Sequence, residues 1–539
     1  MADANDKKAA ATASRPKVIR PFGHLRSERY LEGMYYNEQY CGTAVTCRYI
    51  IPAGLADASK HQEVQKRLVR AVAQTVLDHP QTQVALTGVK TKRPSYIKLD
   101  SINLDDLIDW CSVTAEDDYP AFADARLTQE LDRPFTHLDT RPGWRITALR
   151  PEGSAFIDVV FNFRHTTTDG TGAKIFQESL LKHLNDPDAD SSSLNLQGGS
   201  TLLFPADHVT CKHPPPMDKW AEFSVGLCFA LSTSWRELKP SFLQKKPTAL
   251  QRSWGPVKPG PGKTERRTIR IGATNAKKIV GACREHKTTV TGLLHGILAA
   301  TLMWETRSFG RGRSLKATTA IDMRRFLGRR PSGLPGTELD PHKTIGVFVT
   351  ALFHEFDEPT VEQLCTKMRG PIEGKGMAHM EGIVWEVAET TRGAIRAKID
   401  RGLKNDIVAL VKVVGDWRAE RARLVKKPRV EAWMVTNLGV MDVNPPTEKT
   451  KDDETSGWRA GRAFFSLSAE TPKPVFSLSS ITAKDGDMCV DVTWQADSNE
   501  FVDGIGNRLG PHLYAWLNYI ATSEWREDVL PPAFGADLA

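Results

Sequence analysis

The chain has 539 residues, a formal net charge of +7 at pH 7, and contents of 40% hydrophobic and 25% charged residues. This length exceeds what one hydrophobic core holds, so we expect two or more domains of ordinary globular composition. The eight cysteines form no C-x-x-C pair, which argues against a disulfide framework and favours a reducing compartment. The mild positive charge lacks an aromatic-interleaved basic stripe, so it does not indicate nucleic-acid binding.

The N-terminal residues and the longest apolar run near the middle of the chain show no secretory or membrane-spanning signal. Residues 1–16 lack the apolar core of a signal peptide and predict a disordered tail. The apolar stretch FSVGLCFALSTSW is interrupted by serines and is shorter than the ~20 residues that a membrane span needs. We therefore expect a cytoplasmic protein without a transmembrane segment.

The first part of the chain alternates strands and helices. TAVTCRYIIP (Thr43 to Pro52) predicts a strand, and His61 to Pro80 predicts an amphipathic helix that ends at the proline. GWRITALR and AFIDVVFNFRH predict two strands, which a turn at Pro151 to Gly153 can join as a hairpin. GAKIFQESLLKHL predicts a helix after them.

The Pro/Gly-rich stretch between residues 206 and 263 predicts a crossover or linker region with one helical piece, Trp220 to Leu238. We therefore expect a tail at 1–16, an N-terminal domain at 17–205 and a C-terminal domain at 264–530. Strands and helices resume in the C-terminal part, in RRTIRIGA, TNAKKIVGACREHK, TVTGLLHGILAATLMWE, LKATTAIDMRRFL, TIGVFVTALFHEF, EAWMVTNLGV and VFSLSSITAKDGDMCVDVTWQ.

A histidine follows the second strand of the predicted hairpin, in RHTTTDGTG (Arg164 to Gly172). With a period of two, His165 continues the more apolar face of that strand, so it is expected to be partly buried at the edge of an interior or channel. Burial disfavours the charged imidazole, and a neutral imidazole can act as a general base near pH 7. From these residues alone, however, His165 can equally be a structural residue, and Asp169 can be a helix N-cap or turn residue before Gly170.

RHTTTDGTG resembles the H-x-x-x-D-G signature of the CoA-dependent acyltransferase superfamily, which includes plant BAHD enzymes, condensation domains and fungal alcohol acetyltransferases. RPFGHLRSERY, HKTTVTGLLHGILAATL, ATTAIDMRRFL followed by IGVF, and MVTNLGV are similar to further segments of that superfamily, in the same order, over roughly residues 20 to 525. The D-F-G-W-G motif of the plant enzymes is absent, since SWG at Ser253 to Gly255 lies in the connector. The resemblance is therefore to the fungal alcohol acetyltransferase branch, and within it to trichothecene-type O-acetyltransferases.

The resemblance implies an α/β fold of two similar chloramphenicol-acetyltransferase-like domains, with mixed sheets flanked by helices and a tunnel at their interface. It implies that His165 takes a proton from an alcohol that attacks acetyl-CoA, without an acyl-enzyme or a metal. Acetyl-CoA is thus a co-substrate, and no bound cofactor is expected. The superfamily is often monomeric, so we expect a monomer.

The resemblance also assigns roles around the histidine. Asp169 is expected to turn away from substrate and pair with Arg324, or as second choice Arg325, and so to aim the imidazole. Gly170 is expected where the loop packs tightly against backbone. Asn437 and Thr436 are candidates for substrate or oxyanion contacts, although a plain turn explains Asn437 equally well.

Other motifs indicate less. The basic segment RGRSLKATTAIDMRRFLGRR is a candidate for CoA phosphates, but such segments are commonly solvated. KPGPGKT lacks the first glycine of a P-loop, DGTGAKI lacks the third glycine of a dinucleotide fingerprint, and G-x-S-x-G is absent. His208, Cys211 and His213 have no second ligand cluster, so we expect no metal.

Two classes of function remain. The first is an O-acyltransferase that moves acetyl from acetyl-CoA to a small alcohol or a trichothecene-like terpenoid, with N-acylation as a variant. The second is a condensation-like or non-catalytic module acting on carrier-bound partners. Acceptance of free acetyl-CoA separates the two.

Overall fold

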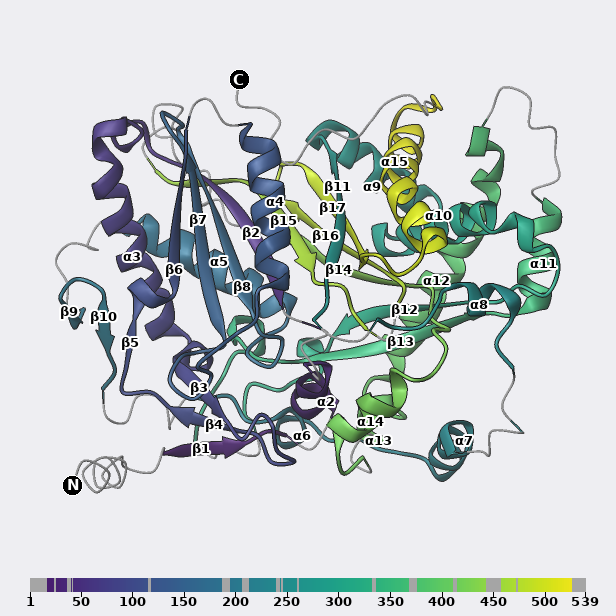
Figure 1. Cartoon of the computed structure of the whole chain (residues 1–539), viewed down its shortest axis with the longest axis horizontal. Coiled ribbons are helices and arrows are strands. Elements are labelled where there is room, and N and C mark those ends of the chain that lie inside the picture. The colour runs from purple at the N-terminus through teal and green to yellow at the C-terminus, as the bar shows by residue number, and fades with distance from the viewer. Residues whose placement is uncertain are drawn as a thin grey trace, which may run out of the picture.

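A computed structural model gives the fold of most of the chain (Figure 1). The predicted tail at residues 1–16 lies outside the described residues. The structure describes residues 17–23, 26–35, 40, 42–114, 118–186, 194–205, 213–238, 243, 246–258, 261–331, 336–367, 376–410, 414–442, 457–471 and 474–525.

The first large sheet has five strands in the order β15, β2, β8, β7 and β6. Neighbouring strands are antiparallel, except that β6 and β7 are parallel. β7 and β8 form the hairpin that the sequence predicts. The strands are β2 (Thr43–Ile50), β6 (Ile108–Val113), β7 (Trp144–Pro151), β8 (Phe156–Phe163) and β15 (Arg459–Leu467).

The second large sheet has six strands in the order β11, β17, β16, β14, β12 and β13. β14 is parallel to both of its neighbours, and the other pairs are antiparallel, so both large sheets are mixed. The strands are β11 (Thr264–Ile271), β12 (Leu315–Asp322), β13 (Val349–Phe356), β14 (Trp433–Met441), β16 (Phe476–Ala483) and β17 (Met488–Gln495).

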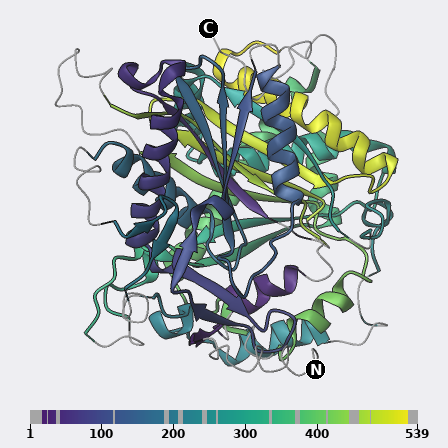
Figure 2. The same ribbon diagram turned by 60° about the vertical axis from the view of Figure 1, so that its left-hand side comes forward.

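Helices cover the two sheets, which lie side by side in Figure 1. α3 (His61–Asp78) and α5 (Gly170–Leu184) share one apolar core with the first sheet, and α4 (Tyr119–Asp132) packs on its other side. Figure 2, in which the first sheet comes forward, shows α3 along its flank. The core of the second sheet includes residues of α9 (Ala273–Glu285), α10 (Val290–Glu305), α12 (Glu381–Arg401) and α15 (Glu500–Thr522).

Shorter elements surround these layers. The small strands are β1 (Val18–Pro21), β3 (Val84–Thr87), β4 (Ser95–Lys98), β5 (Ser101–Asn103), β9 (Leu196–Gln197) and β10 (Thr201–Leu203). The shorter helices are α2 (Arg26–Met34), α6 (Met217–Trp220), α7 (Leu227–Leu238), α8 (Ala249–Ser253), α11 (Glu358–Lys367), α13 (Ile407–Leu410) and α14 (Trp417–Leu424). None of the helices within the described ranges is long and apolar enough to cross a membrane.

Both faces of β8 are buried, including the polar face that alternates with the apolar one. Asp158 on that face accepts two hydrogen bonds from Arg48, at 2.8 and 2.7 Å, and one from the hydroxyl group of Tyr119 on α4. Asn162 donates to the carbonyl oxygen of Glu130, also on α4. These hydrogen bonds to Asp158 and from Asn162 offset part of the desolvation cost of covering this face with α4.

β15 links the two large sheets. It comes from the last part of the chain, yet it forms the edge of the first sheet beside β2. On β17 of the second sheet, Asp491 accepts hydrogen bonds from Ser466 of β15 and from Arg266 of β11. The C-terminal part of the chain thus contributes a strand to the sheet of the N-terminal part, while the domain boundaries given above stay predictions.

α10 is buried almost all round, because it lies between the second sheet and α12. A Cβ atom at Gly296 would lie 2.1 Å from the carbonyl oxygen of Val384 on α12, and one at Gly292 would lie 2.6 Å from that of Ala388. The two glycines, four residues apart, therefore let the backbones of the two helices approach closely.

The single helical piece predicted at Trp220 to Leu238 is two helices, α6 and α7. The backbone at Ala221 is extended, at φ −139° and ψ 149°, which ends α6 directly after Trp220. The predicted helix is thus confirmed over Leu227–Leu238, but its start at Trp220 was wrong because that residue ends a separate short helix.

A chain of hydrogen bonds joins two buried histidines in the second core. His295 accepts a hydrogen bond from the indole nitrogen of Trp433 at 3.0 Å. The hydroxyl group of Thr319 is hydrogen-bonded to both His295 and His354, at 2.8 Å in each case. Burial lowers the pKa of His354 to about 4, and burial together with His354 lowers the pKa of His295 well below its ordinary value. The network therefore holds both imidazoles neutral.

We expect the protein to lose stability as the pH falls from about 6.5 towards 4. The unfolded chain binds protons at the ordinary histidine pKa of about 6.5, whereas these imidazoles resist protonation while folded, so the stabilisation is present above 6.5 and is lost towards 4. Urea unfolding across this range measures the effect. His354→Gln should be less stable at pH 7.5 but should show a flatter pH dependence, and an unchanged pH dependence would contradict the assignment.

Candidate active site

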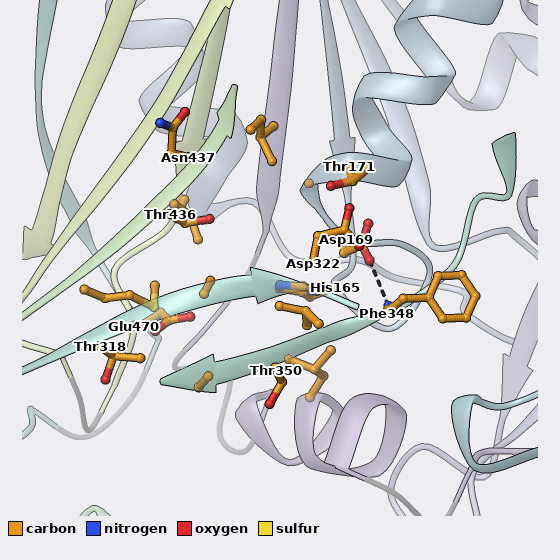
Figure 3. Close-up of a pocket in the computed structure, with 18 of the residues that line it drawn as sticks. His165, Asp169, Thr171, Thr318, Asp322, Phe348, Thr350, Thr436, Asn437 and Glu470 are labelled. Atoms are coloured by element: carbon orange, nitrogen blue, oxygen red, sulfur yellow. Dashed lines mark hydrogen bonds between the residues drawn. The ribbon is translucent and has the colours of Figure 1, made fainter. Parts of the chain in front are cut away.

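A cavity of about 150 Å³ lies where the end of β8, the start of α5 and strands β12, β13 and β14 meet (Figure 3). His165, two residues beyond β8, lies near its centre in this view. The other lining residues come from α2, from the three strands of the second sheet and from β15 and the segment after it. The cavity is thus enclosed by segments far apart in the sequence.

The loop that carries His165 is held at successive positions. Arg164 pairs with Glu32 of α2 at 2.7 Å, and the backbone amide of His165 donates to the hydroxyl group of Tyr35. The next two residues are bound as well: the Tyr96 hydroxyl group donates to the carbonyl oxygen of Thr166 at 2.7 Å, and the Thr167 hydroxyl group donates to the carbonyl oxygen of Gly143 at 3.1 Å. These bonds fix the backbone on both sides of the imidazole.

Asp169 closes the loop and joins it to the second half of the chain. Its Oδ2 accepts from Arg324 at 2.9 Å and from the backbone amide of Phe348 at 2.8 Å, and its Oδ1 accepts from the amide of Gly172 at 2.7 Å as the N-cap of α5. The sequence named both roles, N-cap and partner of Arg324, as alternatives, and the structure has both. Arg325, the second choice of partner, is exposed.

The Asp169–Arg324 pair is buried, with side-chain exposures of 6% and 1%. Burial alone would lower the pKa of Arg324, but the carboxylates of Asp169 and Asp322 raise it above its ordinary value. Two carbonyl oxygens, those of Thr344 and Gly346, accept further hydrogen bonds from Arg324. The guanidinium group is therefore charged and fixed.

Burial lowers the pKa of His165 from its ordinary value. The nearby carbonyl groups of His165 and Thr168 and the charge of Asp169 act in the opposite direction, without reversing the shift. Nδ1 is buried and makes no hydrogen bond of ordinary geometry to the described residues. The arrangement favours a neutral imidazole at pH 7 whose side chain lines the cavity.

Gly170 was expected to pack against backbone, but its nearest neighbours in the structure are side chains. A Cβ atom there would lie 2.7 Å from the side chain of Leu438 on β14 and 2.9 Å from that of Phe465 on β15. The close neighbours are thus side chains that complete the cavity wall, so a larger residue at position 170 would displace the wall itself.

Thr436 and Asn437 both line the cavity, on β14, but their side chains differ in freedom. Asn437 accepts from the amide of Gly439 at 2.8 Å and donates to the hydroxyl group of Thr291 at 3.2 Å, so its carboxamide holds the bulge in β14. Thr436 makes no side-chain hydrogen bond to the described residues. Of the two candidates, Thr436 is therefore the one with a free hydroxyl group.

Three carboxylates in the cavity wall were not predicted from the sequence, and the first is Asp322, which pairs with Arg324 at 3.2 Å. Glu431, just before β14, is buried and accepts a hydrogen bond from Thr318, and Glu470 follows β15. Figure 3 shows Glu470 and Thr318 on one side of His165. No motif marks these glutamates. Only the parallel pairing of β12 with β14 brings Glu431 beside Thr318.

The basic segment proposed for CoA phosphates does not form one cluster. Arg313 is buried and donates to the carbonyl oxygens of Met303 and Gly310, and Arg324 pairs with Asp169. Arg329 and Arg330 are exposed. No lysine or arginine is among the described residues that line the cavity. The residues His208 and Cys211 of the weak metal motif lie outside the described ranges.

Comparison with known proteins agrees with this geometry. Residues 91–332 match the family described as alcohol acetyltransferase. FCK4 of Fusarium pseudograminearum, a probable alcohol acetyltransferase, is 25% identical over 450 residues, which cover 81% of this chain and 84% of that protein.

Solved structures extend the likeness to the fold. The trichothecene 15-O-acetyltransferase TRI3 of Fusarium sporotrichioides superposes with a TM-score of 0.63 at 12% identity over 94% of each chain. The first condensation domain of the calcium-dependent antibiotic synthetase gives a TM-score of 0.51 at 13% identity, over 95% of this chain and 98% of that one. The two-lobed α/β fold with mixed sheets flanked by helices is therefore that of the chloramphenicol-acetyltransferase-like acyltransferases.

We expect Asp169→Asn and Arg324→Met each to lower the free energy of unfolding by about 3–5 kcal/mol, because each change leaves an uncompensated buried group. The double variant should lose less than the sum, since it removes both members of the pair. Urea unfolding measures the three values, and Arg325→Met, at the exposed neighbouring position, serves as the control with an effect within about 0.5 kcal/mol. Additive losses would show that the pair is not coupled.

Proposed function

Because this chain belongs to the acyltransferase superfamily that includes the alcohol acetyltransferases, we propose that it transfers an acetyl group from acetyl-CoA to a hydroxyl group of a small-molecule alcohol, with His165 as the general base. The observation that carries the proposal is the half-buried imidazole of His165, held neutral in a cavity between the two large sheets. The reaction is proposed to take place in the cytoplasm, by a monomer.

The step follows from the chemistry of that imidazole. Its free lone pair takes the proton of the acceptor hydroxyl group while the oxygen forms a bond to the thioester carbonyl carbon. The resulting tetrahedral intermediate collapses with cleavage of the carbon–sulfur bond, and the imidazolium returns the proton to the thiolate of CoA. Base catalysis of this kind contributes about 10²–10⁴-fold, and alignment of the two substrates in one cavity contributes further.

The hydroxyl group of Thr436 is the donor that we assign to the oxygen of the intermediate. It lines the same cavity as His165 and is not used by another described side chain. A donor placed where negative charge develops lowers the barrier more than one that binds the ground state. Asn437 helps to position Thr436, since its hydrogen bonds to Thr291 and Gly439 fix the bulge that follows Thr436.

The proposed acceptor is an apolar ring system that carries at least one further hydroxyl group, as trichothecene-type terpenoid alcohols do. Apolar side chains supply one part of the wall, including Leu31 and Met34 of α2 and Phe348, just before β13. Glu431 and Glu470 supply hydrogen-bond acceptors in another part. A carboxylate accepts but does not donate, so it favours an acceptor molecule with a spare donor.

An amine acceptor is the second candidate. The carboxylates of Glu431 and Glu470, with no lysine or arginine among the described lining residues, also suit a cationic group. An ammonium group must lose a proton before it can attack, so N-acylation would rise with pH beyond the range in which His165 titrates.

We expect His165→Ala to lower kcat for alcohol-dependent thiol release from acetyl-CoA by about 10²–10⁴-fold, with a small effect on CoA binding. In the wild type, kcat/KM should stay flat from pH 8 through the ordinary histidine pKa and should fall only below it, because burial lowers the pKa of His165. His342→Ala, at an exposed position, is the matched control. Near-normal transfer by His165→Ala would overturn the mechanism, and activity restricted to carrier-bound acyl groups would favour the condensation-like alternative.

We expect Glu431→Gln to lower kcat/KM by about tenfold or more for an acceptor with a second hydroxyl group, because a hydrogen bond to a charged group is replaced by a weaker one. For a related acceptor with a single hydroxyl group the change should be small. Parallel kinetics on the two acceptors measure the difference, with Glu355→Gln on the exposed edge as control. Equal losses on both acceptors would assign Glu431 to the wall structure alone.

A further inference from the structure

The segment between the two halves of the chain carries most of the large apolar side chains exposed on the described surface. The described surface exposes nine large apolar side chains, and five of them lie between residues 225 and 243. On α7, Leu227 is 74% exposed, Leu231 62% and Trp235 61%. A cluster of this kind marks an interaction site, because isolated exposure is ordinary but contiguous exposure is not.

The three residues of α7 form one stripe. They are spaced by four residues, which places them along the same face of the helix. The opposite face carries the half-buried Phe229 and Ala230 and the buried Thr233. α7 therefore rests on the protein by one face and presents a second apolar face outward, at the lower right of Figure 1, away from both large sheets.

Hydrogen bonds fix the segment before α7 to a basic part of the surface. The amide of Asn405 donates to the carbonyl oxygen of Ser224 at 2.8 Å, and the amide of Gly226 donates to the Asn405 side chain at 2.8 Å. Lys404, directly before Asn405, and Arg401, four positions before it, are both exposed. These cations therefore flank the start of the helix.

A second anchor brings more positive charge. The indole nitrogen of Trp220 donates to the carbonyl oxygen of Gly328 at 2.6 Å, next to the exposed Arg329 and Arg330. Within residues 219–250 the sequence itself has five lysines and arginines against two glutamates. The segment that contains α7 is thus basic in sequence, and exposed cations lie close in sequence to both residues that anchor its first part, Asn405 and Gly328.

We propose that α7 docks on the surface of an anionic lipid bilayer, with Leu227, Leu231 and Trp235 inserted at the headgroup level. Amphipathic helices bind lipid surfaces through this combination of a tryptophan- and leucine-bearing apolar face and neighbouring lysine and arginine side chains. Each such cation near an anionic leaflet strengthens binding about fivefold. The inference goes beyond the acyl transfer proposed above and does not depend on it, since it concerns a surface outside the cavity.

Co-flotation of the full-length protein with vesicles tests the proposal. We expect binding to vesicles of phosphatidylcholine with about one third phosphatidylserine, weaker binding to phosphatidylcholine alone, and weakening as salt is raised. Leu231→Ser/Trp235→Ser should lower the partition coefficient about tenfold or more. Arg401→Gln/Lys404→Gln should lower it about twentyfold or less on anionic vesicles and have no effect on neutral ones.

Val18→Ser is the matched control, because Val18 is 53% exposed on β1 and should not change partition. Thiol release with a water-soluble alcohol should be unchanged in all these variants, which separates this surface from the cavity. Absence of binding to either kind of vesicle would overturn the proposal, as would equal binding by wild type and the α7 variant. A wild type that forms dimers, does not bind vesicles and becomes monomeric in the α7 variant would assign the stripe to contact between two copies instead.

Discussion

The carboxylate of Asp169 is the constraint on which the candidate site depends. One oxygen caps α5, which belongs to the first half of the chain, while the other accepts from Arg324 and from the amide of Phe348 in the second half. A buried charge must be fully hydrogen-bonded to be tolerated, so these partners cannot separate without a large cost. The three residues between His165 and Asp169 therefore lie in a loop whose end is bonded to both halves of the chain. The direction of the imidazole is set by the packing of the halves and not by the loop alone.

The strand β15 also holds the two large sheets together. It pairs along its length with β2, and its Ser466 reaches Asp491 of the other sheet. The same strand lines the cavity through Phe465 and Leu467, and Glu470 follows it. Because one segment lines the cavity and also contacts the second sheet, a change in the relative position of the sheets would break the Ser466–Asp491 bond and disturb the cavity wall. This favours a preformed cavity over one assembled when substrate binds.

Local sequence patterns were enough to predict many of the helices and strands within each half of the chain. The hairpin of β7 and β8, helix α3, helix α5 and the position of His165 at the end of β8 follow from periodicity, turn residues and the N-cap. The pairing of β15 with β2 joins residues more than 400 positions apart, and no local signal reports it. Glu431 was missed for the same reason, since its place in the wall depends on how β14 lies beside β12. Gly170 was given the wrong neighbours because its contacts come from β14 and β15.

Negative and positive side chains are distributed differently between the cavity and the outer surface. Carboxylates line the cavity, and the described lining includes no lysine or arginine. In the proposed transfer, the phosphate groups of CoA would therefore be repelled from that interior, and only the thioester end would suit the surroundings of His165. Positive charge lies outside, at Arg329, Arg330, Arg401 and Lys404, where water screens it. A neutral base benefits from this arrangement. Cations beside His165 would lower its pKa further, whereas the charge of Asp169 acts in the opposite direction, which suits the general-base role proposed for this imidazole.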